Sequence, residues 1–141
     1  MPVRLFCYGT LMVPAVWLKV VGRPRDGADA WLEDYACRQV RGECFPGLLP
    51  KAGARTPGIV YRGLSQRDLE CLDRFEGGAY ERRLVPVQLA SGDSALAWCF
   101  VTRKPYRRRL SKESWSRRDF VSAHLNRYLA SGRVAGVQSG R

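Results

Sequence analysis

The spacing of apolar and polar positions divides the first half of the chain into short elements. A β-type apolar run at residues 3–8 stops at a Gly-Thr pair, which predicts a buried strand that leads into a glycine turn. The apolar stretch 11–21 favours a short helix that begins near Pro14. Residues 31–56 mix apolar, glycine and proline positions, and they predict only strand fragments joined by turns.

The pattern is clearer in the middle of the chain. Residues 58–64 are typical of a strand, and Ser65 is placed to cap a helix over 66–75 whose leucines share one face. A glycine pair ends this helix and leaves Glu76 in its last turn or just beyond it. We therefore expect a carboxylate at the point where a helix gives way to a turn.

The remaining elements complete a single domain. Residues 84–89 and 95–102 predict a β-hairpin, and apolar spacing over 116–129 predicts a helix. No repeat or linker divides the chain, so we expect one domain over residues 1–130 and a polar tail over 131–141. No regular βαβ alternation, GxGxxG or GxxxxGK[ST] motif occurs, which argues against Rossmann and P-loop folds. The pattern predicts a compact α+β domain around a small, partly closed sheet.

Composition excludes two classes of protein. The 141 residues are 45% hydrophobic and 11% aromatic, too apolar for a disordered chain and enough for one core. No apolar run approaches the ~18 residues that a membrane span needs. The formal net charge is +11, and residues 103–118 hold eight Lys and Arg against Glu113 alone, a local excess of +7. This charge favours anionic partners without naming one.

Thiol and imidazole chemistry is not favoured. The five cysteines are odd in number, form no CxxC pair and follow no secretory leader, so we expect reduced thiols in a cytoplasmic protein. His124 is the only histidine, and a zinc centre or a Ser/His or Cys/His nucleophile would have to use it. We therefore expect no metal site.

Two motifs stand in a characteristic order. The first is Tyr8-Gly9-Thr10-Leu11, and the second is Leu72-Asp73-Arg74-Phe75-Glu76-Gly77, followed by Tyr80, Arg82, Val85 and Val87. Together they resemble the γ-glutamylcyclotransferase superfamily, which includes the AIG2-like proteins. Phe45-Pro46-Gly47 is similar to the middle segment of that family, and the resemblance covers roughly Val3 to Val101.

The resemblance implies a fold and a reaction. Members of that family form a small mixed β-barrel with helices packed outside, and they release a γ-glutamyl group as 5-oxoproline. The α-amine of the substrate attacks its own γ-carbonyl, so neither a serine or cysteine nucleophile nor a cofactor is needed. The expected partner is a small γ-glutamyl molecule, and the oligomeric state is left open.

The same resemblance assigns roles to particular residues. Glu76 matches the catalytic glutamate, which takes a proton from the α-amine and returns one to the leaving nitrogen. The turn from Tyr8 to Leu11 matches the substrate-binding turn, whose backbone N–H groups suit a carboxylate or a developing oxyanion. Tyr80 and Arg82 are further candidates for substrate contact.

Each role has a structural alternative. Glu76 could be a solvated carboxylate at a helix end, and the turn from Tyr8 to Leu11 could be only a turn. Tyr80 could belong to the core, and Arg82 and Arg83 alternate along a strand, so one of them should face solvent.

One segment departs from the family pattern. Many members have a basic loop with Gly and Asn after the first motif, whereas residues 12–17 are apolar. Either the leaving group has a hydrophobic part, or these residues form a packed structural helix. The resemblance leaves the substrate open among γ-glutamyl peptides, glutathione, γ-glutamyl-lysine crosslinks and γ-glutamylated pathway intermediates.

The basic segment 103–118 supports an alternative function. It interleaves Tyr106 and Trp115 with arginines, a pattern that also occurs in proteins that bind single-stranded nucleic acid. Two further interpretations are a solvated loop and a surface that steers anionic substrates toward a cleft. A steep dependence of binding on salt would distinguish nucleic-acid binding from turnover of a small substrate.

Overall fold

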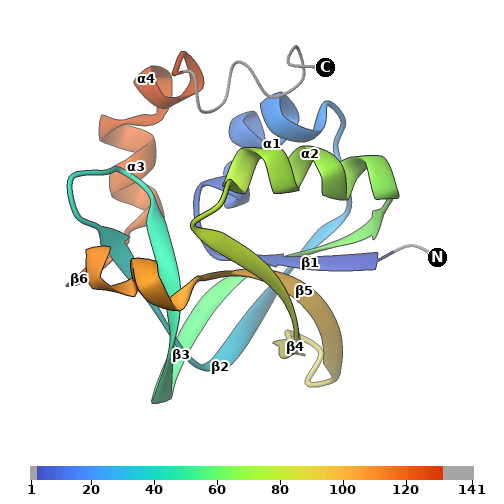
Figure 1. Ribbon diagram of the computed structural model, residues 1–141. Helices are drawn as coiled ribbons and strands as arrows, with labels where there is room; N and C mark the ends of the chain where they lie inside the picture. The colour runs from blue at the N-terminus through green and yellow to red at the C-terminus, as the bar shows by residue number, and fades with distance from the viewer. Residues whose placement is uncertain (1–2, 132–141) are drawn as a thin grey trace.

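The computed structural model describes residues 3–131 (Figure 1). In chain order the elements are β1 (Val3–Cys7), η1 (Thr10–Met12), α1 (Pro14–Val21), β2 (Gly27–Val40), β3 (Pro46–Leu64), α2 (Gln66–Glu76), β4 (Tyr80–Leu89), β5 (Ser94–Thr102), η2 (Lys104–Arg109), β6 (Leu110–Ser114), α3 (Arg117–Ala123) and α4 (Leu125–Leu129). None of the described helices is long and apolar enough to span a bilayer. The domain boundary near residue 130 stays a prediction, and residues 132–141 of the expected tail lie outside the described residues.

Five strands close on themselves. The sheet order is β3-β1-β5-β4-β2, and β2 also pairs with β3, so the ring is complete and β6 extends it from β2. The pairing of β1 with β5 is parallel, with Leu5 opposite Trp98, and the other pairings are antiparallel. The predicted fold class, a small mixed β-barrel with a few packed helices, is confirmed.

Strands β2 and β3 correct the prediction of fragments over residues 31–56. They pair continuously apart from a bulge at Asp34, which has a φ of 65° and accepts a hydrogen bond from Gly53 N at 2.9 Å. Farther along β3, a Cβ on Gly58 would lie 2.6 Å from the Phe6 ring and would also contact the carbonyl of Cys7. Gly53 therefore takes part in the bulge, and Gly58 lets β1 approach β3.

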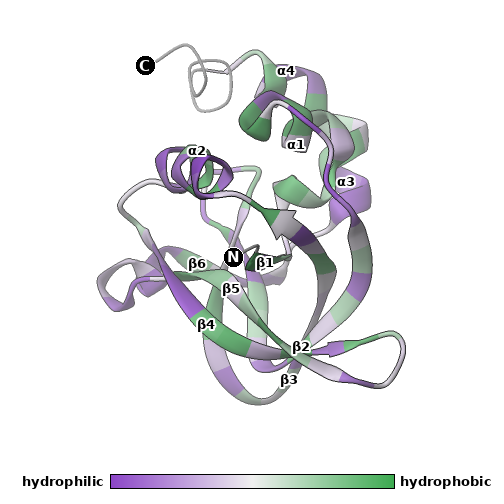
Figure 2. Cartoon of the chain, turned by 90° about the vertical axis from the view of Figure 1, so that its right-hand side faces the viewer, coloured by the Kyte–Doolittle hydropathy of each residue, from purple (hydrophilic) through white to green (hydrophobic). Residues whose placement is uncertain are grey.

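Alternation along β1 separates two cores. Leu5 and Cys7 belong to the cluster between barrel and helices, whereas Phe6 and Tyr8 belong to the cluster inside the barrel. Helices α1, α2, α3 and α4 lie together on one side of the barrel, as Figures 1 and 2 show. This arrangement follows from the period of two in a strand.

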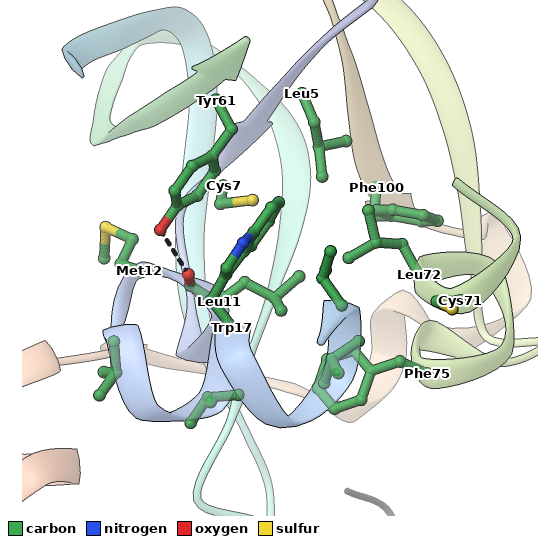
Figure 3. Packing of buried hydrophobic residues seen from close by; sticks show 14 of the residues in the cluster. Leu5, Cys7, Leu11, Met12, Trp17, Tyr61, Cys71, Leu72, Phe75 and Phe100 are labelled. Carbon is green, nitrogen blue, oxygen red and sulfur yellow. Dashed lines mark hydrogen bonds between the residues drawn. The ribbon is translucent and has the colours of Figure 1, made fainter. Parts of the chain in front are cut away.

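The apolar segment after the first motif is a packed helix. Val16 and Trp17 of α1 are buried, and the Trp17 ring stacks on Tyr61 with 3.8 Å between centroids. The hydroxyl of Tyr61 donates to the carbonyl of Leu11 at 2.8 Å (Figure 3). Of the two explanations for residues 12–17, the packed structural helix is therefore the one that the structure supports.

Local signals determine the helix ends. Ser65 and Asp68 form a reciprocal capping box at the start of α2, as Ser65 predicted. The single helix expected over 116–129 is instead two short helices that meet at His124.

The strand pair β4 and β5 confirms the predicted hairpin, and β4 begins earlier than expected, at Tyr80.

Candidate active site

The turn that follows β1 is fixed by tertiary contacts. Tyr8 is buried, and its hydroxyl donates to the carbonyl of Phe100 on β5 at 2.6 Å. A Cβ on Gly9 would lie 2.7 Å from Cγ of Pro46, so the turn packs against β3 at a distance that only glycine allows. Tyr8 and Gly9 therefore fix the backbone of this turn against β5 and the start of β3.

Thr10 and Leu11 continue the turn as the single-turn helix η1. Met12 N donates to the carbonyl of Gly9 at 3.0 Å, and both Thr10 and Leu11 are buried. The hydroxyl oxygens of Thr10 and Tyr128 lie 3.4 Å apart. Helix α4 therefore supports η1 through Tyr128, a residue that the sequence did not single out.

Glu76 is the last residue of α2 and is half-buried. Gly77 has a φ of 77°, and its N–H donates to the carbonyl of Asp73 at 3.1 Å, which closes the helix. The preceding Phe75 packs edge-on against the Tyr128 ring with 6.5 Å between centroids. Glu76 is thus held at the end of a well-packed helix.

A narrow pocket brings the two sequence motifs together. Its volume is about 30 Å³, room for one or two water molecules. We call it the Glu76 pocket, and its lining includes Tyr8, Gly9, Thr10, Leu11, Phe45, Pro46, Glu76, Tyr80 and Phe100. Among these described residues, Glu76 is the one with a carboxyl group. An adjoining cavity of about 270 Å³ shares Phe45, Glu76 and Tyr80 with it.

Burial favours the neutral forms of Tyr8, Cys7 and Cys99 beside this pocket. Burial, followed by the nearby Tyr80 and Glu76, raises the pKa of Tyr8 well above its ordinary value. Burial, followed by the charge of Glu76, also raises the pKa of the Cys7 and Cys99 thiols. These cysteines are consequently core residues, with no tendency to act as thiolates.

Tyr80 lines the pocket and also has a structural role. It is buried, and its hydroxyl donates to the carbonyl of Pro46 at 2.7 Å. The hydroxyl proton is therefore engaged with β3.

Arg82 is not brought to this site. Its guanidinium donates to both carboxylate oxygens of Asp73, at 2.8 and 3.2 Å, and lies 5.1 Å from the Trp98 ring. Arg83 pairs instead with Glu81. Since Arg82 is also absent from the pocket lining, we omit it from the candidate substrate contacts.

The basic segment is built into the domain. It forms η2, β6 and the start of α3, and Arg107 Nε donates to the carbonyl of Thr102 at 3.1 Å. Tyr106 and Arg109 line the adjoining cavity beside Glu76, a placement that the sequence motifs did not reveal. Most side chains of the segment are exposed, as the solvated interpretation expects, but the backbone forms regular elements rather than a loop. Nucleic-acid binding stays a prediction.

Comparisons with known proteins identify relatives of this chain. Residues 5–117 match the family model described as gamma-glutamyl cyclotransferase, AIG2-like. AIG2-like proteins C and D of Arabidopsis thaliana are 32% identical over 92 residues and 33% identical over 93 residues. The matches cover 65% of this chain but 54% and 61% of those relatives, so the chain aligns with little more than half their length.

Solved structures share the fold. A gamma-glutamyl cyclotransferase superposes with a TM-score of 0.62 and 17% identity, covering 73% of this chain and 68% of its own. An AIG2-like protein from Mus musculus superposes with a TM-score of 0.60 and 23% identity, covering 82% and 88%. The family match extends from β1 to the start of α3 and includes both motifs of the pocket. The chain therefore belongs to the gamma-glutamyl cyclotransferase, AIG2-like family.

Proposed function

We propose that this protein releases 5-oxoproline from a γ-glutamyl amine or γ-glutamyl peptide, with Glu76 as general acid and base. The observation that carries the proposal is the position of the Glu76 carboxyl, which lines a narrow pocket together with the turn from Tyr8 to Leu11. Family membership supports the reaction class.

The reaction needs one group that moves a proton. Glu76 accepts a proton from the α-ammonium of the substrate, and the neutral nitrogen attacks the γ-carbonyl carbon to form a five-membered ring. The bond from that carbon to the leaving nitrogen then breaks, and Glu76 returns its proton to that nitrogen. The ring nitrogen gives up its second proton to the released amine, so the products are 5-oxoproline and an ammonium, and atoms and charge balance without a co-reactant.

The surroundings of Glu76 suit this step. Backbone N–H groups of the turn are donors for the oxygen on which charge develops, and buried surroundings strengthen such interactions. The reacting atoms would contact Glu76 and the turn, and the adjoining cavity of about 270 Å³, which Glu76 also lines, has room for the rest of the substrate. Holding the α-amine about 3 Å from the γ-carbonyl supplies the positioning contribution.

The test compares substitutions of two glutamates on α2, Glu76 and Glu70. The purified protein, Glu76→Gln and the control Glu70→Gln are incubated with γ-glutamyl amino acids, glutathione and γ-glutamyl-ε-lysine, and 5-oxoproline is measured by mass spectrometry. Glu70 is exposed on α2, so its substitution removes the same charge outside the pocket. We expect Glu76→Gln to lower the rate by about 10²–10⁴ and Glu70→Gln to leave it unchanged. Equal rates for wild type and Glu76→Gln would reject the assigned role.

A further inference from the structure

A basic cavity lies between the β2–β3 ribbon and the chain that runs from β6 into α3. Its volume is about 430 Å³, within the usual range for small-molecule sites. Arg38 comes from β2, Lys51 and Arg55 come from β3, and Arg117 is the first residue of α3. Figure 1 shows β6 and α3 on the same side of the barrel as this part of the ribbon. Cationic side chains from three elements therefore line one hollow.

The charges of the basic cavity are poorly neutralised. None of its lining residues is acidic. Within residues 3–131, Arg38, Lys51 and Arg117 have no carboxylate within 4.0 Å. Arg55 pairs with Glu33 at 3.4 Å, where both side chains are about half exposed. Like charges around one hollow repel each other, and an anion bound among them would relieve that repulsion.

The walls of the basic cavity are fixed by other contacts. The Trp115 indole N–H donates to the carbonyl of Cys44 at 2.8 Å, and its ring lies 5.8 Å from that of Phe120. The Cys37 thiol lies 3.9 Å from the carbonyl oxygen of Tyr8. Burial raises the pKa of Cys37 to about 12, so this thiol adds no negative charge. The basic cavity therefore combines a defined shape with a positive charge that the neutral Cys37 thiol does not offset.

We propose that the basic cavity binds a small organic molecule that carries a phosphate group. Guanidinium groups bind phosphate oxygens through paired N–H donors, which favours this anion at Arg38 and Arg117. The apolar surfaces of Met12, Pro57 and Trp115 suit the organic part of such a ligand. Among their lining residues, the basic cavity and the Glu76 pocket share only Tyr8, so the site is separate from the proposed catalytic carboxylate.

Calorimetric titration tests the ligand class. The probes are AMP, glycerol phosphate, inorganic phosphate and citrate, in a buffer of about 0.15 M ionic strength. We expect at least one of the two phosphate esters to bind with a Kd below about 1 mM and more tightly than phosphate or citrate. Arg117→Gln should weaken that binding about tenfold. The control Arg118→Gln removes the same charge from the next residue, outside the cavity, and should leave the Kd unchanged.

A spectroscopic readout places the ligand. In an NMR titration, the ester that binds should shift the indole N–H resonance of Trp115 and leave that of Trp98 on β5 unchanged. The Glu76→Gln variant should bind the ester with the same Kd as the wild type. The proposal is overturned if neither ester binds at about 10 mM, if citrate binds best, or if Arg117→Gln and Arg118→Gln weaken binding equally. Preference for single-stranded oligo-dT with a steep salt dependence would also overturn it, and would assign these cations to nucleic acid.

Discussion

Asp68 and Glu76 are carboxylates at opposite ends of α2, and their surroundings differ. Asp68 is fully buried in the first turn, where it completes the capping box with Ser65 and binds Arg25 at 2.8 Å. Glu76 is half-buried in the last turn, beside the pocket formed by the first motif. The helix dipole favours a negative charge at the first position and disfavours one at the second. Asp68 therefore stabilises the helix, whereas the helix dipole gives Glu76 no such stabilisation, and the role proposed for Glu76 is a chemical one.

The pKa of Asp68 shows how its surroundings balance. Burial raises the pKa of this carboxyl, and the Ser65 N–H together with Arg25 and Arg23 more than offsets that effect. The net result is a pKa below the ordinary value of 3.8. A buried carboxylate kept ionised in this way supports the fold and is unsuited to accept a proton near neutral pH.

The largest expected effect on stability is that of Asp68→Ala. This change removes the half of the capping box in which the Asp68 carboxylate accepts from the Ser65 N–H, and it leaves the charge of Arg25, which is 18% exposed, without its partner. We expect the free energy of unfolding to fall by about 2–4 kcal/mol, measured by urea denaturation. The rate per folded molecule should change little, and a large loss of rate at unchanged stability would contradict the separation of roles.

The converse variant is Glu76→Asp. It keeps the charge at the end of α2 but shortens the side chain by one methylene. The carboxyl, which is the proposed proton carrier, then lies farther from the reacting nitrogen of the substrate. We expect kcat to fall about 10²-fold, with urea denaturation essentially unchanged. Full activity would show that the pocket tolerates a displaced carboxyl and would weaken the proposed mechanism.

The pH dependence of stability tests the role assigned to Asp68. Because its pKa is lower in the folded protein than in the unfolded chain, its stabilising contribution is complete above about pH 5 and is lost as pH falls through the folded pKa, below 3.8. The difference in Tm between wild type and Asp68→Asn should therefore be constant near neutral pH and shrink in acid. A difference in Tm that grows in acid would show that folding raises, rather than lowers, the pKa of Asp68.

The smallest effect is expected from Tyr128→Phe. The variant removes the hydroxyl that faces Thr10 and keeps the ring that packs against Phe75, next to Glu76. We expect a loss of about 0.5–1.5 kcal/mol in unfolding free energy and a fall of a few fold in kcat, measured with the best γ-glutamyl substrate. Unchanged values for both would remove Tyr128 from the support of the turn.

Local signals in the sequence were sufficient for part of the fold and the site. The cap at Ser65 and the glycine after Glu76 placed the ends of α2, and the first glycine turn ended β1 as expected. The family resemblance paired the turn from Tyr8 to Leu11 with Glu76, and the structure brings these residues into one pocket. Capping and turn formation depend on neighbours along the chain, which explains this success.

Features that depend on distant residues were missed. Prolines and glycines within β3 looked like turns because their role depends on pairing with β2, such as the pairing of Pro50 with Tyr35. Alternation put Arg82 on one face of its strand but did not reveal Asp73 as its partner. The contact of Tyr128 with Thr10 joins opposite ends of the domain, and no local pattern marks it.

The parallel pairing of β1 with β5 has a consequence during synthesis. Phe6 pairs with Cys99, and Tyr8 donates to Phe100. The first strand of the barrel therefore completes its pairing only when β5, the last strand of the ring, is present. Contacts so far apart in sequence slow folding, and on the ribosome they form only after β5 has emerged. The turn that lines the Glu76 pocket is made early, but it acquires its final anchor at Phe100 only when the ring of strands closes.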